Sequence, residues 1–300
     1  MGKKSLIMEN IERLGERYIY NKDYLGCWSH ERLRSNWWEA LKFFFSHSFM
    51  RGRRDELSWR YYSFTIEVLK NSFSITEDDL DCSFKRLKGQ REHFNKGCIL
   101  RFKNANKIGR GNSINHPDFK ANVAENNPIV KLLITQRDVE VESDVNYTKI
   151  ISLGNEADLM MVLDVLKFVT SEDNRKNIYN YLNHKITDDG VKAVYDELNE
   201  IRAISDKIST FIIRDLLLMN TKIKIGEDDY RMAFPIDTWV IKIARKLGCD
   251  NANIEDIKAY FIEKCRDSGI DPLKFAAGIW FLGVNSLEIL LENCLAELKI

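Results

Sequence analysis

Apolar residues recur at helical spacing along most of the chain, and this pattern constrains the fold more than any other feature. Segments 35–49 (SNWWEALKFFFSHSF), 156–169 (EADLMMVLDVLKFV) and 271–283 (DPLKFAAGIWFLG) repeat apolar side chains every three to four residues. Strand-like alternation is scarce, and only 129–144 (IVKLLITQRDVEVESD) is compatible with a short strand. Proline occurs four times, so few helices are interrupted. We therefore expect an all-α protein.

Capping residues mark the ends of several expected helices. Ser35 or Asn36 is suited to cap the helix that begins WWEAL, and Asp237 is suited to cap the helix TWVIKIARKL. Gly248 and Gly269 follow the last periodic residues of their helices, where a left-handed glycine commonly ends a helix. The boundaries of these helices can therefore be predicted from local sequence.

The formal net charge is zero, so composition alone indicates neither a nucleic acid nor a lipid surface as partner. The charge is unevenly distributed, however. Residues 83–110 contain nine Lys or Arg and one acid, interleaved with three phenylalanines. Such a segment could follow a phosphate backbone, and it could equally be a solvated loop held by apolar anchors.

No run of about 18 apolar residues is present, so we expect no membrane-spanning helix. The N-terminal stretch turns acidic before the apolar core of a signal peptide could form. The six cysteines and five histidines lack the spacing of zinc or iron–sulfur ligands, so we expect neither a metal nor a cofactor. We expect a cytoplasmic protein, nucleoid-associated if it is prokaryotic, and a monomer.

Two adjacent helices, 190–201 and 207–219, are joined by the short connection RAISD. A connection of this length makes the helices neighbours at a sharp angle. The free N–H groups at the start of the second helix, together with its dipole, can hold a phosphate. Lys207 lies at this helix start, which raises the question of what a long cationic side chain does there.

The second helix has two expected faces. Its apolar stripe is formed by Ile208, Phe211, Ile212 and Leu216, and its polar stripe by Lys207, Thr210 and Arg214. The aromatic ring and the second cation beside Lys207 disfavour a positive charge, so we expect a lowered lysine pKa suited to nucleophilic chemistry. A lysine in a first turn that simply reaches into water is the alternative.

Asp237 has the position of an N-cap, which alone could explain it. Pro235 fixes the approach of the chain, so the carboxylate is expected to be held rigidly and ionised. A rigid carboxylate is also what a developing cation needs beside it.

Together these motifs resemble the helix-hairpin-helix–Gly/Pro–Asp superfamily of DNA glycosylases. The resemblance rests on AISDKIS (203–209) and FPIDTWVIKIARKLG (234–248), and it extends over about residues 187–248. It implies that Lys207 attacks the sugar C1′ and that the carboxylate of Asp237 assists. The thirty-residue spacing of these two residues and the absent cluster cysteines are most similar to the archaeal 8-oxoguanine glycosylases.

The resemblance also implies roles for other residues. Phe211 and Trp280 would stack on opposite sides of the damaged base, the tryptophan lying in the stretch AAGIWFLG. The DNA-binding residues would be Arg202, Ser205, Asp206 and Arg214. Ala203 and Ser205 depart from the glycines usual in the hairpin, which weakens the expected phosphate contact. Ala276 replaces an acid found in several relatives, which leaves the base preference open.

These observations lead us to expect two helical subdomains with a cleft between them. We expect an N-terminal helical region with the basic loop (1–118), a helical core with the hairpin and the Pro-x-Asp loop (119–248), and C-terminal helices that pack back on the first region (249–300). The expected function is base-excision repair of double-stranded DNA, in which an oxidised purine is released through a lysine Schiff base. The alternatives are a non-catalytic helix-hairpin-helix DNA-binding protein and an α-helical protein-interaction module.

Overall fold

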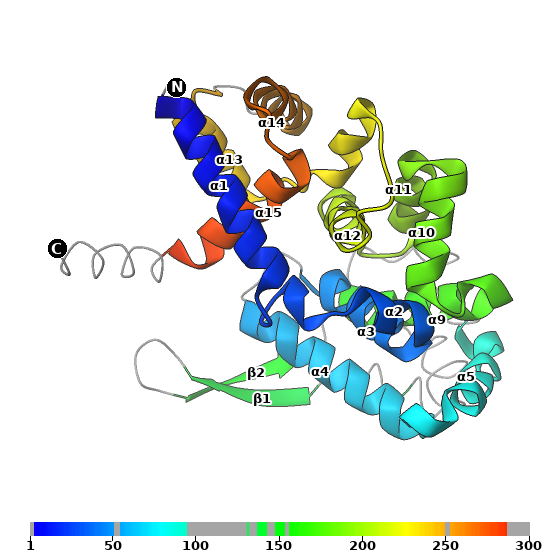
Figure 1. The fold of residues 1–300 in the computed structure, drawn as a ribbon. Helices are drawn as coiled ribbons and strands as arrows, with labels where there is room; N and C mark the ends of the chain where they lie inside the picture. The colour runs from blue at the N-terminus through cyan, green and yellow to red at the C-terminus, as the bar shows by residue number, and fades with distance from the viewer. Residues whose placement is uncertain are drawn as a thin grey trace, which may run out of the picture. The chain divides into compact units, whose positions relative to one another are not determined.

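The computed structural model describes residues 3–50, 55–94, 131, 137–142, 148–153, 156–249 and 253–286 (Figure 1). The helices are α1 Lys3–Tyr20, α2 His30–Ser35, α3 Trp37–Ser48, α4 Asp55–Ser72, α5 Leu80–Lys88, α9 Glu156–Ser171, α10 Ile178–Asp189, α11 Val191–Glu200, α12 Asp206–Met219, α13 Thr238–Leu247, α14 Ile254–Ser268 and α15 Pro272–Val284. Short 3₁₀ helices are η1 Leu25–Cys27, η2 Glu77–Asp79, η4 Asp173–Arg175 and η5 Glu227–Ala233. The all-α class expected from the sequence is confirmed.

Among the residues that the structure describes, two strands accompany the helices and pair in an antiparallel manner. Strand β1 (Arg137–Glu142) pairs with β2 (Thr148–Leu153) so that Arg137 is opposite Leu153. The first strand lies in the stretch for which a short strand was compatible with the sequence. The second strand was not expected.

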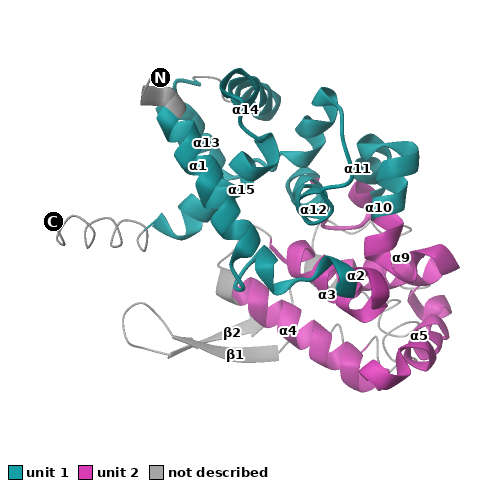
Figure 2. Cartoon of the chain, viewed as in Figure 1, with its two compact units in different colours: residues 1–32, 183–197, 206–300 teal, residues 33–182, 198–205 magenta. Residues whose placement is uncertain are grey.

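The chain forms two compact units (Figure 2). Unit 1 contains residues 1–32, 183–197 and 206–300, and unit 2 contains 33–182 and 198–205. These bounds differ from the expected division at 118 and 248. The first of those boundaries lies outside the described residues. The cleft expected between two subdomains stays a prediction.

The helix ends follow the capping residues. Asn36 caps α3 by accepting hydrogen bonds from the amides of Trp38 (2.9 Å) and Glu39 (3.2 Å). Gly248 and Gly269 end α13 and α14 in the left-handed region, with φ of 95° and 66°. Local hydrogen bonding therefore sets these boundaries.

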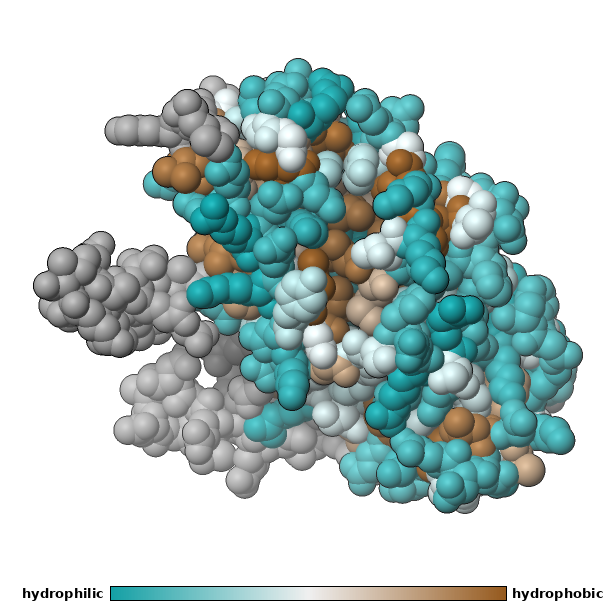
Figure 3. All heavy atoms as spheres, in the orientation of Figure 1, coloured by the Kyte–Doolittle hydropathy of each residue, from teal (hydrophilic) through white to brown (hydrophobic). Residues whose placement is uncertain are grey.

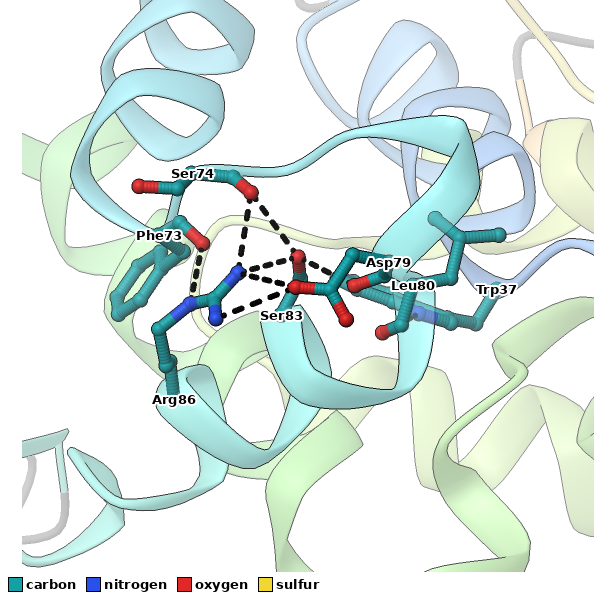
Figure 4. Close-up of polar contacts among 7 residues, drawn as sticks. All are labelled: Trp37, Phe73, Ser74, Asp79, Leu80, Ser83 and Arg86. Atoms are coloured by element: carbon teal, nitrogen blue, oxygen red, sulfur yellow. Dashed lines mark hydrogen bonds and ion pairs between the residues drawn. The ribbon is translucent and has the colours of Figure 1, made fainter.

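In unit 2, Arg86 holds the segment that connects α4 to α5 (Figure 4). Its guanidinium donates to the carbonyls of Phe73 (2.8 Å) and Ser74 (3.1 Å). It also reaches the hydroxyl of Ser83 at 2.8 Å and the carboxylate of Asp79 at 3.3 Å. Arg86 therefore has a structural role within the basic segment 83–110. The end of that segment from residue 95 onward lies outside the described residues.

In unit 1, α1 and α15 pack closely against each other (Figure 1). Glycines allow the approach, because a Cβ at Gly15 would lie 1.9 Å from the carbonyl oxygen of Lys274. A Cβ at Gly278 would lie 1.8 Å from the carbonyl oxygen of Ile11. This crossing brings Tyr18 of α1 beside Trp280 of α15, with ring centroids 5.5 Å apart.

The remaining core of unit 1 combines α13, α14 and α15, with Phe234, Phe261 and Phe275 at its centre. The outer face of α14 is hydrophilic, as Figure 3 shows at the top of the molecule. Among the described helices, none combines the length and the apolar content needed to cross a bilayer.

Candidate functional site

The connection between α11 and α12 is a tight turn stabilised by its own backbone. The amide of Ile201 donates to the carbonyl of Leu198 and that of Ile204 to the carbonyl of Ile201, each at 3.1 Å. Ala203 adopts a φ of 67°, the left-handed region in which glycine is normally preferred. Ala203 thus adopts a backbone conformation that glycine normally supplies, at the position where the resemblance leads us to expect a glycine.

Three amides of this turn are already engaged. Besides the amides of Ile201 and Ile204, the amide of Arg202 donates to a carboxylate oxygen of Asp164 at 3.1 Å. These three N–H groups are therefore not available to a phosphate in this conformation. The expected role of Ser205 stays a prediction, and its side chain is exposed.

Asp206 begins α12 and anchors it inside unit 1. Its Oδ1 accepts from the hydroxyl of Tyr195 at 2.8 Å and from the ammonium of Lys258 at 2.9 Å. Lys258 is only 2% exposed and also pairs with Glu255 at 3.1 Å. The carboxylate of Asp206 thus fixes the start of α12 to α11 and α14. Its expected DNA-binding role has no support in this contact pattern.

Lys207 is the second residue of α12 and is half-buried. Its carbonyl accepts from the hydroxyl of Thr210 at 3.0 Å. Its ammonium makes neither a hydrogen bond nor an ion pair with the part of the chain that the structure describes. The amine is therefore available for an external group.

Asp237 is the N-cap of α13, as the sequence predicted. Its Oδ1 accepts from the amides of Trp239 and Val240, both at 2.9 Å. Its Oδ2 has no partner among the described residues, so one carboxylate oxygen is left for another contact. The 3₁₀ helix η5, which leads to Asp237, packs against α12, the helix that carries Lys207.

Phe211 and Trp280, the two residues expected to stack on a base, contact each other. Their ring centroids are 6.1 Å apart, with an interplanar angle of 34°. Tyr24 packs edge-on against Trp280 at 5.4 Å. Phe211 is buried, whereas Trp280 is partly exposed. The indole is thus the outer member of the pair.

The polar stripe expected on α12 does not face solvent. Thr210 and Arg214 are both 0% exposed, so the expectation of a polar surface there was wrong. Thr210 satisfies its hydroxyl within α12, through the carbonyls of Asp206 and Lys207. In this conformation Arg214 cannot contact a phosphate at the surface of the unit.

Arg214 instead belongs to a buried polar cluster. Its Nε donates to Oδ1 of Asp215 at 2.7 Å, while the hydroxyl of Tyr18 donates to Oδ2 of the same carboxylate. The guanidinium carbon lies 4.6 Å from the ring centroid of Phe211 and 5.0 Å from that of Tyr18. The Nη1 and Nη2 atoms of Arg214 have no hydrogen-bond partner among the described residues.

The protonation states in this cluster follow from burial and pairing. Burial, together with the Asp215 carboxylate, raises the pKa of Tyr18 well above its usual value. Burial alone would lower the pKa of Arg214, but the Asp215 carboxylate raises it overall. The cluster therefore contains a protonated phenol, a carboxylate and a guanidinium.

Several members of this site were not found from the sequence. Tyr18 and Lys258 carry no local signal for these contacts, because Asp215 and Asp206, the partners within the site, are distant from them in the chain. The adjacent pair Arg214–Asp215 within the apolar run FIIRDLLLM was a usable signal, since charged residues are rarely buried unless they are paired. Within the described residues, no group of three or more His, Cys, Asp or Glu side chains is arranged to hold a metal ion.

Comparisons with protein-family models, curated proteins and solved structures give no match for this chain. The resemblance to helix-hairpin-helix glycosylases therefore depends on the residues described above.

Proposed function

We propose that this protein is a bifunctional DNA glycosylase and AP lyase that removes an oxidised purine of the 8-oxoguanine type from double-stranded DNA. The observation that carries the proposal is the unengaged ammonium of Lys207, one helical turn before Phe211, whose ring contacts Trp280. An amine beside a pair of aromatic rings is the arrangement needed to attack a sugar whose base is held by stacking.

In the proposed reaction, the damaged nucleotide is flipped out of the duplex at a cost of about a few kcal/mol. The neutral amine of Lys207 bonds to C1′, and the bond from C1′ to the base breaks with its electron pair leaving on the base. The nitrogen gives up one proton, and the departing base takes up a proton. The bond from C1′ to the ring oxygen O4′ then breaks, O4′ takes up a proton, and the nitrogen lone pair forms the C1′=N bond of the protonated Schiff base. Elimination of the 3′ phosphate then cleaves the strand.

Asp237 is proposed to stabilise the cation that develops at C1′ and nitrogen. Capping of α13 holds its carboxylate through Oδ1, and Oδ2 is the oxygen proposed to face the sugar. A carboxylate fixed in this way requires little reorganisation during the reaction.

The exposed face of α13 supports a phosphate backbone as partner. Lys242, Arg245 and Lys246 are exposed on this helix, which begins directly after Asp237. None of the three forms an ion pair within the described residues. Cations of this kind bind DNA without sequence preference and with strong salt dependence. The enzyme is proposed to act as a monomer in the cytoplasm.

Borohydride trapping tests the proposal. Duplex DNA containing 8-oxoguanine, or a preformed abasic site, is incubated with the protein and reduced. The wild type is expected to form a covalent adduct, and Lys207→Gln is expected to form none. Asp237→Asn is expected to slow adduct formation by about 100-fold or more, the effect usual for losing one preorganised electrostatic group.

Lys192→Gln is the matched control, because Lys192 is an exposed lysine on α11 paired with Asp196. This variant is expected to form the adduct at the wild-type rate. Salt-sensitive DNA binding without an adduct would favour the non-catalytic DNA-binding protein, for which the capping role of Asp237 is sufficient. Absence of binding at about 0.1 M salt would favour a protein-interaction module.

A further inference from the structure

The guanidinium of Arg214 is buried with two unused donor groups. Nη1 and Nη2 are without partners among the described residues, although the side chain is 0% exposed. Leaving a buried donor unsatisfied costs about 1–3 kcal/mol, and more for a charged group. Such a cost is tolerated where a bound group completes the hydrogen bonds.

Arg214, Phe211, Trp280 and Tyr18 form a closed circuit of contacts. The distances are 4.6 Å from Arg214 to Phe211, 6.1 Å from Phe211 to Trp280, 5.5 Å from Trp280 to Tyr18 and 5.0 Å from Tyr18 to Arg214. Phe211 thus contacts both Trp280 and the guanidinium, and Tyr18 contacts the same two groups.

We propose that Arg214 is a catalytic residue for base release, and that Nη1 and Nη2 donate to the 6-keto oxygen of a guanine-type purine. This inference rests on the proposed glycosylase function. A guanidinium pairs well with the O6 acceptor of guanine, whereas the amino group of adenine presents a donor that it cannot bind. The site is thus assigned to guanine-type rather than adenine-type lesions.

The chemical step gives this contact a catalytic effect. When the bond from C1′ to the base breaks, its electron pair moves into the purine ring and is shared with the keto oxygen. The two N–H groups of Arg214 stabilise that negative charge and keep their protons, and the base then takes up a proton from solvent. Because the guanidinium is shielded from water, each hydrogen bond is stronger there than at the surface.

Asp215 and Tyr18 position the guanidinium for this contact. Asp215 binds Nε, which leaves the Nη atoms free, and Tyr18 holds the second oxygen of Asp215. Phe211 and Trp280 contact each other in this structure, so a base stacked between them must separate the two rings. Trp280 is the partly exposed member and is the ring proposed to move.

The test compares two reactions of the same variant. Single-turnover base release from 8-oxoguanine DNA requires Arg214, whereas the borohydride adduct with abasic DNA involves no base. For Arg214→Met, the ratio of the first rate to the second is expected to fall about 100-fold. Arg214→Lys keeps the charge but loses the forked donors, so its ratio is expected to lie between those of Arg214→Met and the wild type.

Selectivity and folding supply the remaining controls. The preference of the wild type for 8-oxoguanine over 8-oxoadenine is expected to shrink in Arg214→Met. The double variant Arg214→Met/Asp215→Leu removes both charges, and its ratio is expected to be as low as that of Arg214→Met. An unchanged ratio, or an equal loss of both reactions in the single and double variants, would overturn the role of Arg214. A wild type that forms no adduct with abasic DNA would instead overturn the glycosylase proposal, and this inference with it.

Discussion

Replacing Gly278 with alanine tests the α1–α15 crossing on which the aromatic cluster depends. The added Cβ would lie 1.8 Å from the carbonyl oxygen of Ile11 and 2.9 Å from the amide nitrogen of Gly15. Ordinary contact begins at 3.4 Å, so the two backbones must separate by about 1.6 Å at this point. Both obstructing groups are backbone atoms of a helix, which cannot rotate away as a side chain would.

The cost can be worked out from the side chains that α1 buries. Met8, Ile11 and Tyr18 are each less than 5% exposed, and burial of such a side chain contributes about 1.5–3 kcal/mol. A gap of this size forfeits at least half of the contact energy, or about 3 kcal/mol in total. The higher helix propensity of alanine relative to glycine offsets about 1 kcal/mol of this loss. The net loss is therefore about 2 kcal/mol, equivalent to roughly 4–8 °C in melting temperature.

Urea and thermal unfolding, followed by circular dichroism, measure this loss. Gly226→Ala is the control, because its nearest neighbour is a flexible carboxylate oxygen at 3.5 Å and its φ is −76°. That variant is expected to stay within about 0.5 kcal/mol of the wild type. Gly15→Ala is expected to destabilise the protein as well. The double variant Gly15→Ala/Gly278→Ala should lower the free energy of unfolding by less than the sum of the two single losses, because one separation of the helices relieves both clashes. A Gly278→Ala variant as stable as the control would refute the close crossing.

Other consequences follow from single contacts. Ala203→Gly is expected to stabilise the protein by about 0.5–1 kcal/mol in urea unfolding, because alanine is strained at a φ of 67°; no gain from this change would contradict the turn geometry. Asp206→Asn is expected to cost about 1–2 kcal/mol, because it weakens the pairing of the buried ammonium of Lys258, whereas Glu255→Gln at the exposed partner should cost less than about 0.5 kcal/mol. Equal losses in these two variants would refute the anchoring role of Asp206. Maleimide labelling of the native protein at pH 8, followed by peptide mapping, should modify the exposed Cys27 but not Cys265, whose pKa is raised by burial; labelling of Cys265 before unfolding would contradict its placement.

Features set by neighbouring residues could be predicted from the sequence. The caps Asn36 and Asp237 and the terminal glycines Gly248 and Gly269 depend on hydrogen bonds within a few residues, so their residue types indicated them, although Ser35 and Asn36 were left as alternatives for one cap. The apolar spacing likewise predicted the helices. The expectation that Phe211 and Trp280 stack on opposite sides of one base, by contrast, came from a family resemblance and not from spacing, and the structure brings the two rings into contact.

Features set by distant partners could not be predicted in this way. A helical wheel divides a helix into two faces only if one side meets solvent, but residues 208–218 of α12 are buried all round. The hydrogen bond between Lys258 and Asp206 likewise joins residues far apart in the chain. Each of the two units also combines segments that are distant in the sequence. Two adjacent charges in an apolar helix were the one available indication that α12 is enclosed.

That buried pair also permits a test of whether Arg214 is present for folding or for function. A buried ion pair is commonly less stable than apolar side chains of similar volume, by about 1–4 kcal/mol, and here two guanidinium donors are left unsatisfied. Replacing only the arginine would leave the carboxylate of Asp215 buried, so the informative variant combines Arg214→Met, Asp215→Leu and Tyr18→Phe. We expect this variant to unfold at a higher urea concentration than the wild type and to have lost base release. If it is instead less stable by more than about 2 kcal/mol, the pair contributes to folding, and the unsatisfied donors no longer require a ligand to account for them.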